Sequence, residues 1–195
     1  MQKLSNLERK YGDYRWFFTS EDILVIGGKS DEQNELALDS FLKPNYIVMH
    51  TSAPGSPFMI IQSNNPSKKD IEETAIFCAC FSQQWKSGKK TIEVDMFKGN
   101  QIYKKSGMKM GTFGIKGGIK TMEVKPELVL VIQKSKLRAV PKTTKEKILV
   151  EIRQGNLTKE KASEKIFKII KDKYHFPISK DEIMQAIPSS KLDVR

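Results

Sequence analysis

Residues 14–30 read YRWFFTSEDILVIGGKS, and this stretch decides how the first part of the chain folds. It contains two apolar runs, Tyr14–Phe18 and Ile23–Ile26, which are rich in aromatic and β-branched residues. The polar segment TSED, at 19–22, separates the runs, and a glycine pair breaks the second one. Apolar runs of this length on either side of a polar turn predict a β-hairpin.

A helix is predicted directly after this hairpin. Ser30 and Gln33, three residues apart, form the capping-box pattern that satisfies the first backbone N–H groups of a helix. We therefore predict a helix over 31–42, which Pro44 ends. A second helix is predicted over 67–86, where apolar residues recur at helical spacing.

Short β-rich runs, separated by turn-forming residues, make up most of the remaining sequence up to residue 133. One of them alternates clearly, with Ile92, Val94 and Met96 on one face. Together with the two helices, these runs predict an α+β fold built on a mostly antiparallel sheet. The predicted strands after the hairpin are 46–49, 58–61, 91–97, 101–103, 112–115, 120–124 and 128–132.

The character of the chain changes near Pro141. Thr143, Thr158 and Ser179 are good helix N-caps, and they precede three predicted helices at about 144–154, 158–173 and 180–187. The stretch before them is rich in Lys and Arg and is predicted to be a linker. The predicted division is therefore a mixed domain over 1–133, a basic linker over 134–142 and a small helical C-terminal appendage over 143–195.

Length and composition favour an ordinary globular chain. It has 195 residues, 38% of them hydrophobic, and no apolar run approaches the ~20 residues that span a bilayer. Met1–Lys10 is polar and lacks the apolar core of a signal peptide. Cys78 and Cys80, the two cysteines, are too few for a disulfide framework. We expect a cytoplasmic protein with no membrane partner.

Positive charge is concentrated in the middle of the chain. The formal net charge is +11. Residues 1–80 carry eight Lys and Arg against eleven Asp and Glu, whereas residues 81–145 carry fifteen against four. A one-sided field of this kind indicates a polyanionic partner. The alternative is a basic, soluble protein without such a partner.

The basic segment also interleaves aromatic residues and glycines. Lysine ammonium groups neutralise phosphates, and exposed aromatic rings stack on unpaired bases, a combination that favours RNA or single strands. The alternative is a solvated hairpin whose aromatic residues belong to the core. The residues concerned are Lys98, Tyr103, Lys104, Lys105, Lys109, Phe113, Lys116 and Lys120.

His50 ends a predicted strand and precedes a loop of serine, proline and glycine. A nucleophilic triad would need a partner hydroxyl and an orienting acid, and nothing marks the nearby Ser52 or Ser56 as a nucleophile. Two cysteines without a histidine at ligand spacing predict no metal site, and no cofactor is predicted. The GGKS segment at 27–30 lacks the upstream glycine of a phosphate loop, although its helix N-terminus could still face a phosphate.

Three blocks of the sequence resemble the NFACT-R domain, the RNA-binding module of the NEMF, FbpA and Caliban family, in its stand-alone form. The first block, at 14–36, contains YRWFF, GGK and QNEL. The second joins His50 to PGSP at 54–57, and the third, at 94–121, contains VD, KK and a series of glycines and lysines. The ordered series covers about residues 13–125 and is more specific than any single block.

The resemblance implies a non-catalytic RNA-binding protein that contacts rRNA or tRNA in translation or ribosome-associated quality control. The large ribosomal subunit is a further partner that the resemblance suggests. It also implies that His50, Gly55 and Ser56 line one surface beside the lysine-rich strands. Two other classes stay open: an RNA-processing enzyme that uses His50, and a DNA-binding or adaptor protein whose helical tail recruits a partner. Outside the lysine-rich segment, the expected RNA-binding residues are Arg15, Trp16, Lys29, His50, Gly55 and Ser56.

Overall fold

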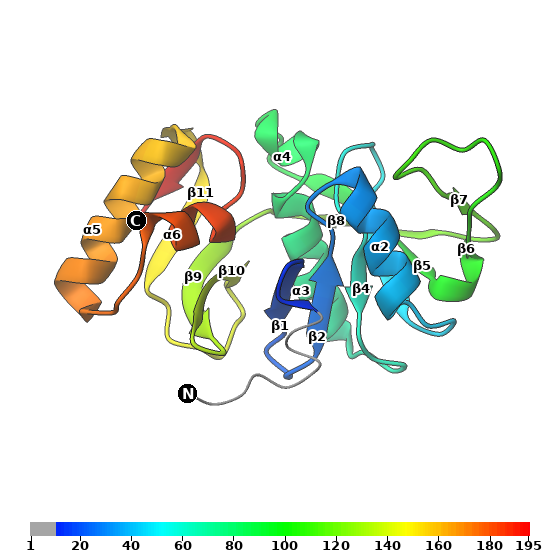
Figure 1. The fold of residues 1–195 in the computed structure, drawn as a ribbon, viewed down its shortest axis with the longest axis horizontal. Coiled ribbons are helices and arrows are strands. Elements are labelled where there is room, and N and C mark those ends of the chain that lie inside the picture. Colours follow the sequence, from blue (N-terminus) through cyan, green and yellow to red (C-terminus); the bar gives the residue numbers. More distant parts are fainter. Residues whose placement is uncertain (1–10) are drawn as a thin grey trace.

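The computed structural model describes residues 11–195, which form two lobes that lie side by side (Figure 1). The first lobe, residues 11–125, contains a six-stranded sheet and a two-stranded ribbon. The second lobe, residues 126–195, contains a four-stranded sheet. The predicted α+β class with mostly antiparallel pairing is confirmed. The expectation for Met1–Lys10 lies outside the described residues.

The six-stranded sheet is antiparallel throughout, in the order β1-β2-β4-β3-β5-β8. The predicted hairpin is confirmed at its edge, where Trp16 lies opposite Ile26 and Phe17 lies opposite Val25. The strands are β1 (Arg15–Phe18), β2 (Leu24–Gly27), β3 (Ile47–Thr51), β4 (Met59–Ile61), β5 (Ile92–Lys98) and β8 (Lys120–Val124).

Two helices cover opposite faces of this sheet, α2 (Asp31–Phe41) and α3 (Lys68–Cys80). Successive residues of a strand point to opposite faces. Trp16 therefore packs in the cluster with α2, whereas Phe17 packs against Phe77 of α3, with ring centroids 4.3 Å apart. Because both faces are covered, β2 and β4 are apolar and buried along their length instead of alternating with polar residues, and β1 is likewise apolar after Arg15.

The predicted helix over 67–86 is divided in two. Ser67 and Asp70 form a reciprocal capping box at the start of α3. Ser82 interrupts the helix and caps a separate turn, α4 (Gln83–Lys86), whose backbone lies against the loop that follows β3. The interruption matters because it brings α4 to the junction between the two lobes (Figure 1).

A two-stranded ribbon, defined here as residues 99–118, extends from the end of β5 and lies beside α2 (Figure 1). Its strands, β6 (Ile102–Tyr103) and β7 (Gly114–Ile115), are shorter than the predicted ones. The loop between them, residues 104–113, carries three of the candidate lysines. The ribbon is thus a projecting element that is anchored at its base.

The second lobe confirms the predicted C-terminal helical region and adds a sheet to it. Two helices, α5 (Lys159–Tyr174) and α6 (Lys180–Ala186), begin as predicted at Thr158 and Ser179. Each cap oxygen accepts the backbone N–H three residues further on. The sheet has the order β10-β9-β11-β12. Its strands are β9 (Leu128–Gln133), β10 (Lys136–Pro141), β11 (Val150–Leu157) and β12 (Leu192–Val194).

The prediction of a basic linker over 134–142 is wrong. Residues 136–141 form β10, which pairs along its whole length with β9. Leu137 and Val140 are fully buried, so this segment contributes to the core of the second lobe. Lys134 and Lys136 are exposed at the turn between β9 and β10, and their charge made the segment resemble a linker in the sequence.

The predicted helix over 144–154 is also wrong, because residues 150–157 form β11. Val150 and Ile152 are buried, whereas the residue between them is partly exposed, which is the period of two that a strand requires. Thr143 does not cap a helix. Its hydroxyl donates to the carboxylate of Glu73 in the first lobe, at 2.7 Å.

The two lobes share one hydrophobic core. Phe17 and Phe77 of the first lobe belong to the same buried cluster as Leu137 of the second. The side-chain amide of Gln133 also acts as an extra strand residue at the edge of β1. It accepts the N–H of Phe18 at 2.9 Å and donates to the Phe18 carbonyl at 2.8 Å.

Truncation at residue 140 tests this shared core. Removing 141–195 takes away β11, β12 and α5, and it exposes Leu130 and Ile132 on β9. We expect the shortened chain to aggregate or to lose its cooperative melting transition. Each Å² of apolar surface that becomes exposed removes about 25 cal/mol from the free energy of unfolding. Circular dichroism melting and gel filtration against the full chain measure this. A cooperative transition at the native temperature would mean that the first lobe is independent of residues 141–195.

Candidate nucleic-acid interface

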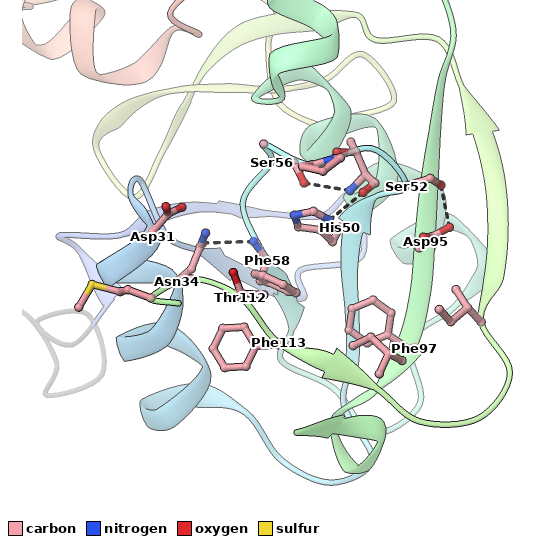
Figure 2. Close-up of a pocket in the computed structure, with 17 residues that line it drawn as sticks. Asp31, Asn34, His50, Ser52, Ser56, Phe58, Asp95, Phe97, Thr112 and Phe113 are labelled. Carbon is pink, nitrogen blue, oxygen red and sulfur yellow. Dashed lines mark hydrogen bonds between the residues drawn. The ribbon is translucent and has the colours of Figure 1, made fainter. Parts of the chain in front are cut away.

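A cavity of about 470 Å³ opens between the N-terminal end of α2, the end of β3 and the tip of the ribbon (Figure 2). Three aromatic rings, those of Phe58, Phe97 and Phe113, line it together with His50. Its rim carries two carboxylates, Asp31 and Asp95, and its lining includes neither lysine nor arginine. The cavity is therefore aromatic inside and negative at its edge.

The loop after β3 forms one wall of the cavity, and its closure depends on Ser56. The Ser56 hydroxyl accepts the N–H of Thr51 at 2.9 Å, which ties the end of the loop to its beginning. Gly55 has a φ of +96°, and a Cβ there would come within 2.6 Å of Gln83 Cγ. Only glycine allows this turn to pack so closely against α4. Ser56 is buried, so its role in the structure is to hold the loop.

His50 is held in one orientation. Its ring lies against Phe58, with centroids 4.6 Å apart, and its Nδ1 lies 2.7 Å from the carbonyl oxygen of Thr51. A carbonyl only accepts, so Nδ1 carries the proton and Nε2 is the acceptor of the neutral ring. Burial lowers the pKa of His50 below its usual range, partly opposed by the hydrogen bond to Thr51 and by the charge of Asp95. His50 is therefore neutral at pH 7.

Asp95 is the most strongly positioned group on the rim. Its Oδ1 accepts hydrogen bonds from the hydroxyls of Ser52 and Thr121, both at 2.7 Å. The Ser52 hydroxyl thus points toward a carboxylate and away from His50 (Figure 2). Asp95 lies opposite His50 in the β3–β5 pairing, which explains why these two residues meet.

Asn34 joins α2 to the floor of the cavity. It is buried, and its Oδ1 accepts the N–H of Phe58 at 3.2 Å. A Cβ at Gly28 would lie 2.5 Å from the Asn34 backbone nitrogen, so glycine lets the start of α2 approach the sheet closely. This contact fixes the distance between α2 and β4.

Glu35 anchors the ribbon to α2. Its carboxylate forms an ion pair with Lys104 and accepts the N–H of Gly111 at 2.7 Å. These two hydrogen bonds lower the pKa of Glu35 below its usual range. Lys104 also donates to the carbonyl of Lys109 at 2.8 Å and lies over the Phe113 ring at 4.8 Å. Lys104 is therefore already paired, and its main contact is inside the protein.

The Tyr103 ring is also engaged. Lys105 and Lys116 lie over it, 5.4 and 5.2 Å from its centroid. The backbone of Gly114 packs so closely on the ring that a Cβ there would lie 2.1 Å from Cζ. Tyr103 thus organises the ribbon and the lysines on it. The candidate lysines with exposed side chains and no ion pair among residues 11–195 are Lys98, Lys105, Lys109, Lys116 and Lys120.

The structure brings together some of the predicted residues and separates others. His50, Gly55, Ser56 and Phe113 line one cavity, with the ribbon lysines beside it. By contrast, Arg15, Trp16 and Lys29 lie at the junction of the two lobes. Trp16 is only 2% exposed and packs among other aromatic rings, so it cannot stack on a base.

Sequence reasoning missed three residues that build the site: Asn34, Glu35 and Phe58. Asn34 and Glu35 lie within the QNEL segment quoted above, but their roles depend on residues 24 to 76 positions away. A buried polar residue on the apolar face of a helix is a signal that could have identified Asn34. In the sequence, Phe58 is the first residue of a predicted strand, and nothing there indicates that its ring lines a cavity.

The cysteines take no part in the site. Both are buried, and burial raises the pKa of Cys78 to about 12. The Cys78 thiol lies 3.5 Å from the carbonyl oxygen of Pro57, where it helps to pack the loop against α3. In the part of the chain that the structure describes, no group of three or more His, Cys, Asp and Glu residues could hold a metal ion.

The family model for the NFACT protein RNA binding domain matches residues 13–117, more than half of the chain. The chain therefore belongs to this family, as the sequence blocks indicate. Among residues 11–195, no helix is both long enough and apolar enough to cross a bilayer.

Similar proteins include an archaeal Rqc2 homolog and subunits of the ribosome quality control complex. The archaeal Rqc2 homolog aRqcH of Methanocaldococcus jannaschii is 29% identical over 96% of this chain and 30% of its own length. The ribosome quality control complex subunit NEMF of Homo sapiens is 31% identical over 37% of this chain and 7% of its own length. The chain thus spans less than a third of these relatives.

The comparisons also extend the match beyond the first lobe. The archaeal alignment covers 96% of the chain, so it includes residues beyond 125, where the sequence blocks stop. The C-terminal part of the fibronectin/fibrinogen-binding protein from Streptococcus suis has the same fold over 58% of this chain and 45% of that chain. Its TM-score is 0.54 at 22% identity.

The lowered pKa of His50 predicts how the free energy of unfolding changes with pH. A histidine in the unfolded chain titrates near pH 6.5, whereas folding lowers the pKa of His50. The unfolded state therefore binds the proton first as pH falls, and the contribution of neutral His50 is complete above about 6.5 and lost progressively below it. We expect the unfolding free energy of the native chain to fall more steeply between about pH 7 and 5 than that of His50→Gln. Urea titrations at each pH measure the two slopes, and equal slopes would contradict the burial of a neutral ring.

Proposed function

We propose that the chain binds unpaired RNA, with one base in the cavity of His50, Phe58 and Phe113 and the flanking backbone along the ribbon lysines. The observation that carries this proposal is the separation of the two chemistries. The cavity has aromatic walls and no cationic lining residue, whereas exposed lysines surround it on the ribbon. A nucleotide has the same division, because its base is flat and neutral and its phosphate is charged.

The contents of the cavity favour a base over a phosphate. Asp31 and Asp95 at the rim repel an anion. The same carboxylates accept hydrogen bonds from exocyclic amino groups, as acidic side chains do from cytosine. His50 Nε2 offers one more acceptor, and the aromatic walls offer a stacking surface. A base that carries an amino group fits these partners.

Single-stranded or looped RNA fits this arrangement better than duplex DNA. A base reaches a pocket only after it leaves its stack, which loops, bulges and ends of RNA allow at low cost. The ribbon lysines surround a pocket mouth and form no helix that could enter a major groove. This supports RNA over the DNA-binding alternative.

The role that we propose is non-catalytic. His50 Nδ1 is bonded to a backbone carbonyl instead of a carboxylate, and the hydroxyl of Ser52 is bonded to Asp95. A histidine acting as general base would need a substrate or nucleophile within its reach. Incubating tRNA and rRNA fragments with the chain and analysing their nucleosides tests this. A product that disappears with His50→Ala would support the RNA-processing alternative.

The setting that we propose is ribosome-associated quality control in the cytosol, with rRNA or tRNA as the ligand. The support comes from relatives such as NEMF, which is named as a subunit of the ribosome quality control complex. The second lobe is covered by the archaeal alignment, so it fits a shared part of such factors better than an added adaptor tail. Crosslinking in cells followed by sequencing of bound RNA identifies the ligand.

Phe113 tests the base pocket. It is half-buried at the cavity wall and meets Phe58 edge-on, with centroids 5.3 Å apart. Loss of one stacking ring costs about 1–3 kcal/mol, so Phe113→Ala should weaken binding of a short single-stranded RNA roughly 5- to 150-fold. Phe167→Ala, at a half-buried aromatic residue on α5, is the matched control. Fluorescence anisotropy measures the RNA affinity of both variants. An equal loss of affinity in the two would contradict base binding in this cavity.

Salt dependence tests the ribbon. Five exposed lysines on or beside it, Lys98, Lys105, Lys109, Lys116 and Lys120, can each displace a counterion from a single strand. These five contacts should contribute roughly −3.5 to the slope of the logarithm of the association constant against the logarithm of salt. Lys105→Gln with Lys116→Gln should make this slope shallower by about 1.4, whereas Lys104→Gln should change it least, because Lys104 pairs with Glu35. A native slope near zero would contradict the electrostatic part of the proposal.

A further inference from the structure

A second cavity, of about 170 Å³, lies in the cleft between the two lobes. Three cationic side chains line it, Arg15, Lys29 and Lys86, and no carboxylate does. Two hydroxyl residues, Ser189 and Ser190, face them from the loop between α6 and β12. Hydrogen-bond donors therefore converge from both lobes on one small space.

Arg15 is the most unusual group in this cleft. It lies on β1, with its guanidinium 3.9 Å above the Phe81 ring. Its buried Nε has no hydrogen-bond partner among residues 11–195. Arginines in protein interiors are normally matched by a carboxylate or by several acceptors. Among the described residues 11–195, no hydrogen bond or ion pair joins Arg15 to either, and burial together with the charge of Arg138 lowers its pKa to about 10.

More positive charge surrounds Arg15. Arg138 lies over the Trp16 ring at 4.2 Å, and its buried Nε also has no partner within the described residues. Lys159 reaches in from the start of α5 and donates to Ser189 at 3.3 Å. Burial and the charge of Arg15 lower the pKa of both Lys29 and Lys159. The cluster is self-repelling, and a bound anion would relieve that repulsion.

Nearby acids do not neutralise the cluster. Glu182 is the carboxylate whose charge acts on Arg138, but it accepts the N–H of Leu137 at 2.9 Å. Asp13 faces Lys29 and Glu160 faces Lys159, and both side chains are exposed to solvent. The cations that line the cavity therefore keep their donors available for a ligand.

We propose that this cleft between the lobes is a second binding site, which takes a phosphate group between Arg15, Lys29 and Lys86. A phosphate has several strong acceptor oxygens and no obligatory donor, which matches a lining of guanidinium, ammonium and hydroxyl groups. Residues from both lobes complete the site, because the serines belong to the second lobe.

The two cavities adjoin at the loop after β3. Gly55 lines the base cavity, and its carbonyl accepts the N–H of Gln83, which lines the cleft, at 2.8 Å. Asp31 and Lys29, two residues apart at the start of α2, face the two cavities separately. A strand with a base in the first cavity can therefore place a phosphate in the second. The assignment of the phosphate to an RNA strand rests on the proposed function. The other possible source of the phosphate group is a free phosphorylated compound.

A titration with inorganic phosphate tests the site without RNA. The nitrogen and proton of the Arg15 Nε–H group are followed by NMR, with sodium chloride of equal ionic strength as the reference. We expect a saturable shift with phosphate that chloride does not produce. Lys29→Gln with Lys86→Gln should abolish it, because both exposed ammonium groups are removed at nearly constant side-chain size. Lys68→Gln with Lys168→Gln, exposed lysines on α3 and α5, removes the same charge and should leave the shift intact.

An RNA titration of the same variants separates the two sources of phosphate. If the strand reaches the cleft, the Lys29 and Lys86 double variant should lose roughly tenfold in RNA affinity, and its salt slope should be shallower by about 1.4 than that of the native chain. The control pair should change both quantities little. A phosphate shift with unchanged RNA affinity would support the site with a free phosphorylated compound as its ligand.

Two results would overturn the proposal or separate it from the proposed function. A native chain whose Arg15 signal responds alike to phosphate and chloride would rule out the site, whatever its RNA affinity. A native chain that binds phosphate at Arg15 but no RNA would refute the proposed function and support the site. Melting curves of both double variants check that each is folded before either result is interpreted.

Discussion

The burial of the six-stranded sheet on both faces is the constraint on which the rest of the structure depends. Alternate residues of β1 contribute to different cores, so that Trp16 packs with α2 and Phe17 packs with α3. This arrangement fixes where each helix lies and therefore where each helix end lies. The start of α2 and the end of β3 meet at one side of the sheet, where the cavity of His50 and Phe113 forms. The same strand β1, at the sheet edge, contacts the second lobe through Phe18 and Gln133.

Polar anchors then turn this scaffold into a site. Glu35 holds the ribbon over the cavity, Ser56 closes the loop after β3, and Asn34 ties α2 to β4. Each anchor is a side chain that accepts a hydrogen bond from a backbone N–H group. These bonds hold the loops and the ribbon in place against the helices and the sheet. The chemistry of the cavity follows from this arrangement, because His50 is held neutral and Phe113 is brought to the cavity wall against Phe58.

Charge is distributed unevenly over the two cavities. The base cavity has carboxylates at its rim and exposed lysines beyond it, whereas the cleft between the lobes has cations and hydroxyls. The positive charge near the two cavities thus falls into two groups, the exposed lysines of the ribbon and a partly buried cluster in the cleft. These two groups differ physically. Ribbon lysines are screened by salt, whereas the cleft cations lie in a lower dielectric, where the attraction between opposite charges is stronger.

The sequence by itself determined the local structure and the family. The hairpin of residues 14–27, the helix begun by Ser30 and the strands of the basic segment follow from short-range periodicity and capping, which neighbouring residues decide. The three blocks identified the family because the order and spacing of the motifs are read directly from the sequence and do not depend on the folded structure. The sequence did not distinguish β10 and β11 from a linker and a helix, because Leu137 and Val150 are buried only once β9 lies between their strands. Nor could it show that Arg15 belongs with Ser189 and not with His50. Those groupings depend on contacts between residues far apart in the chain, and only the tertiary structure decided them.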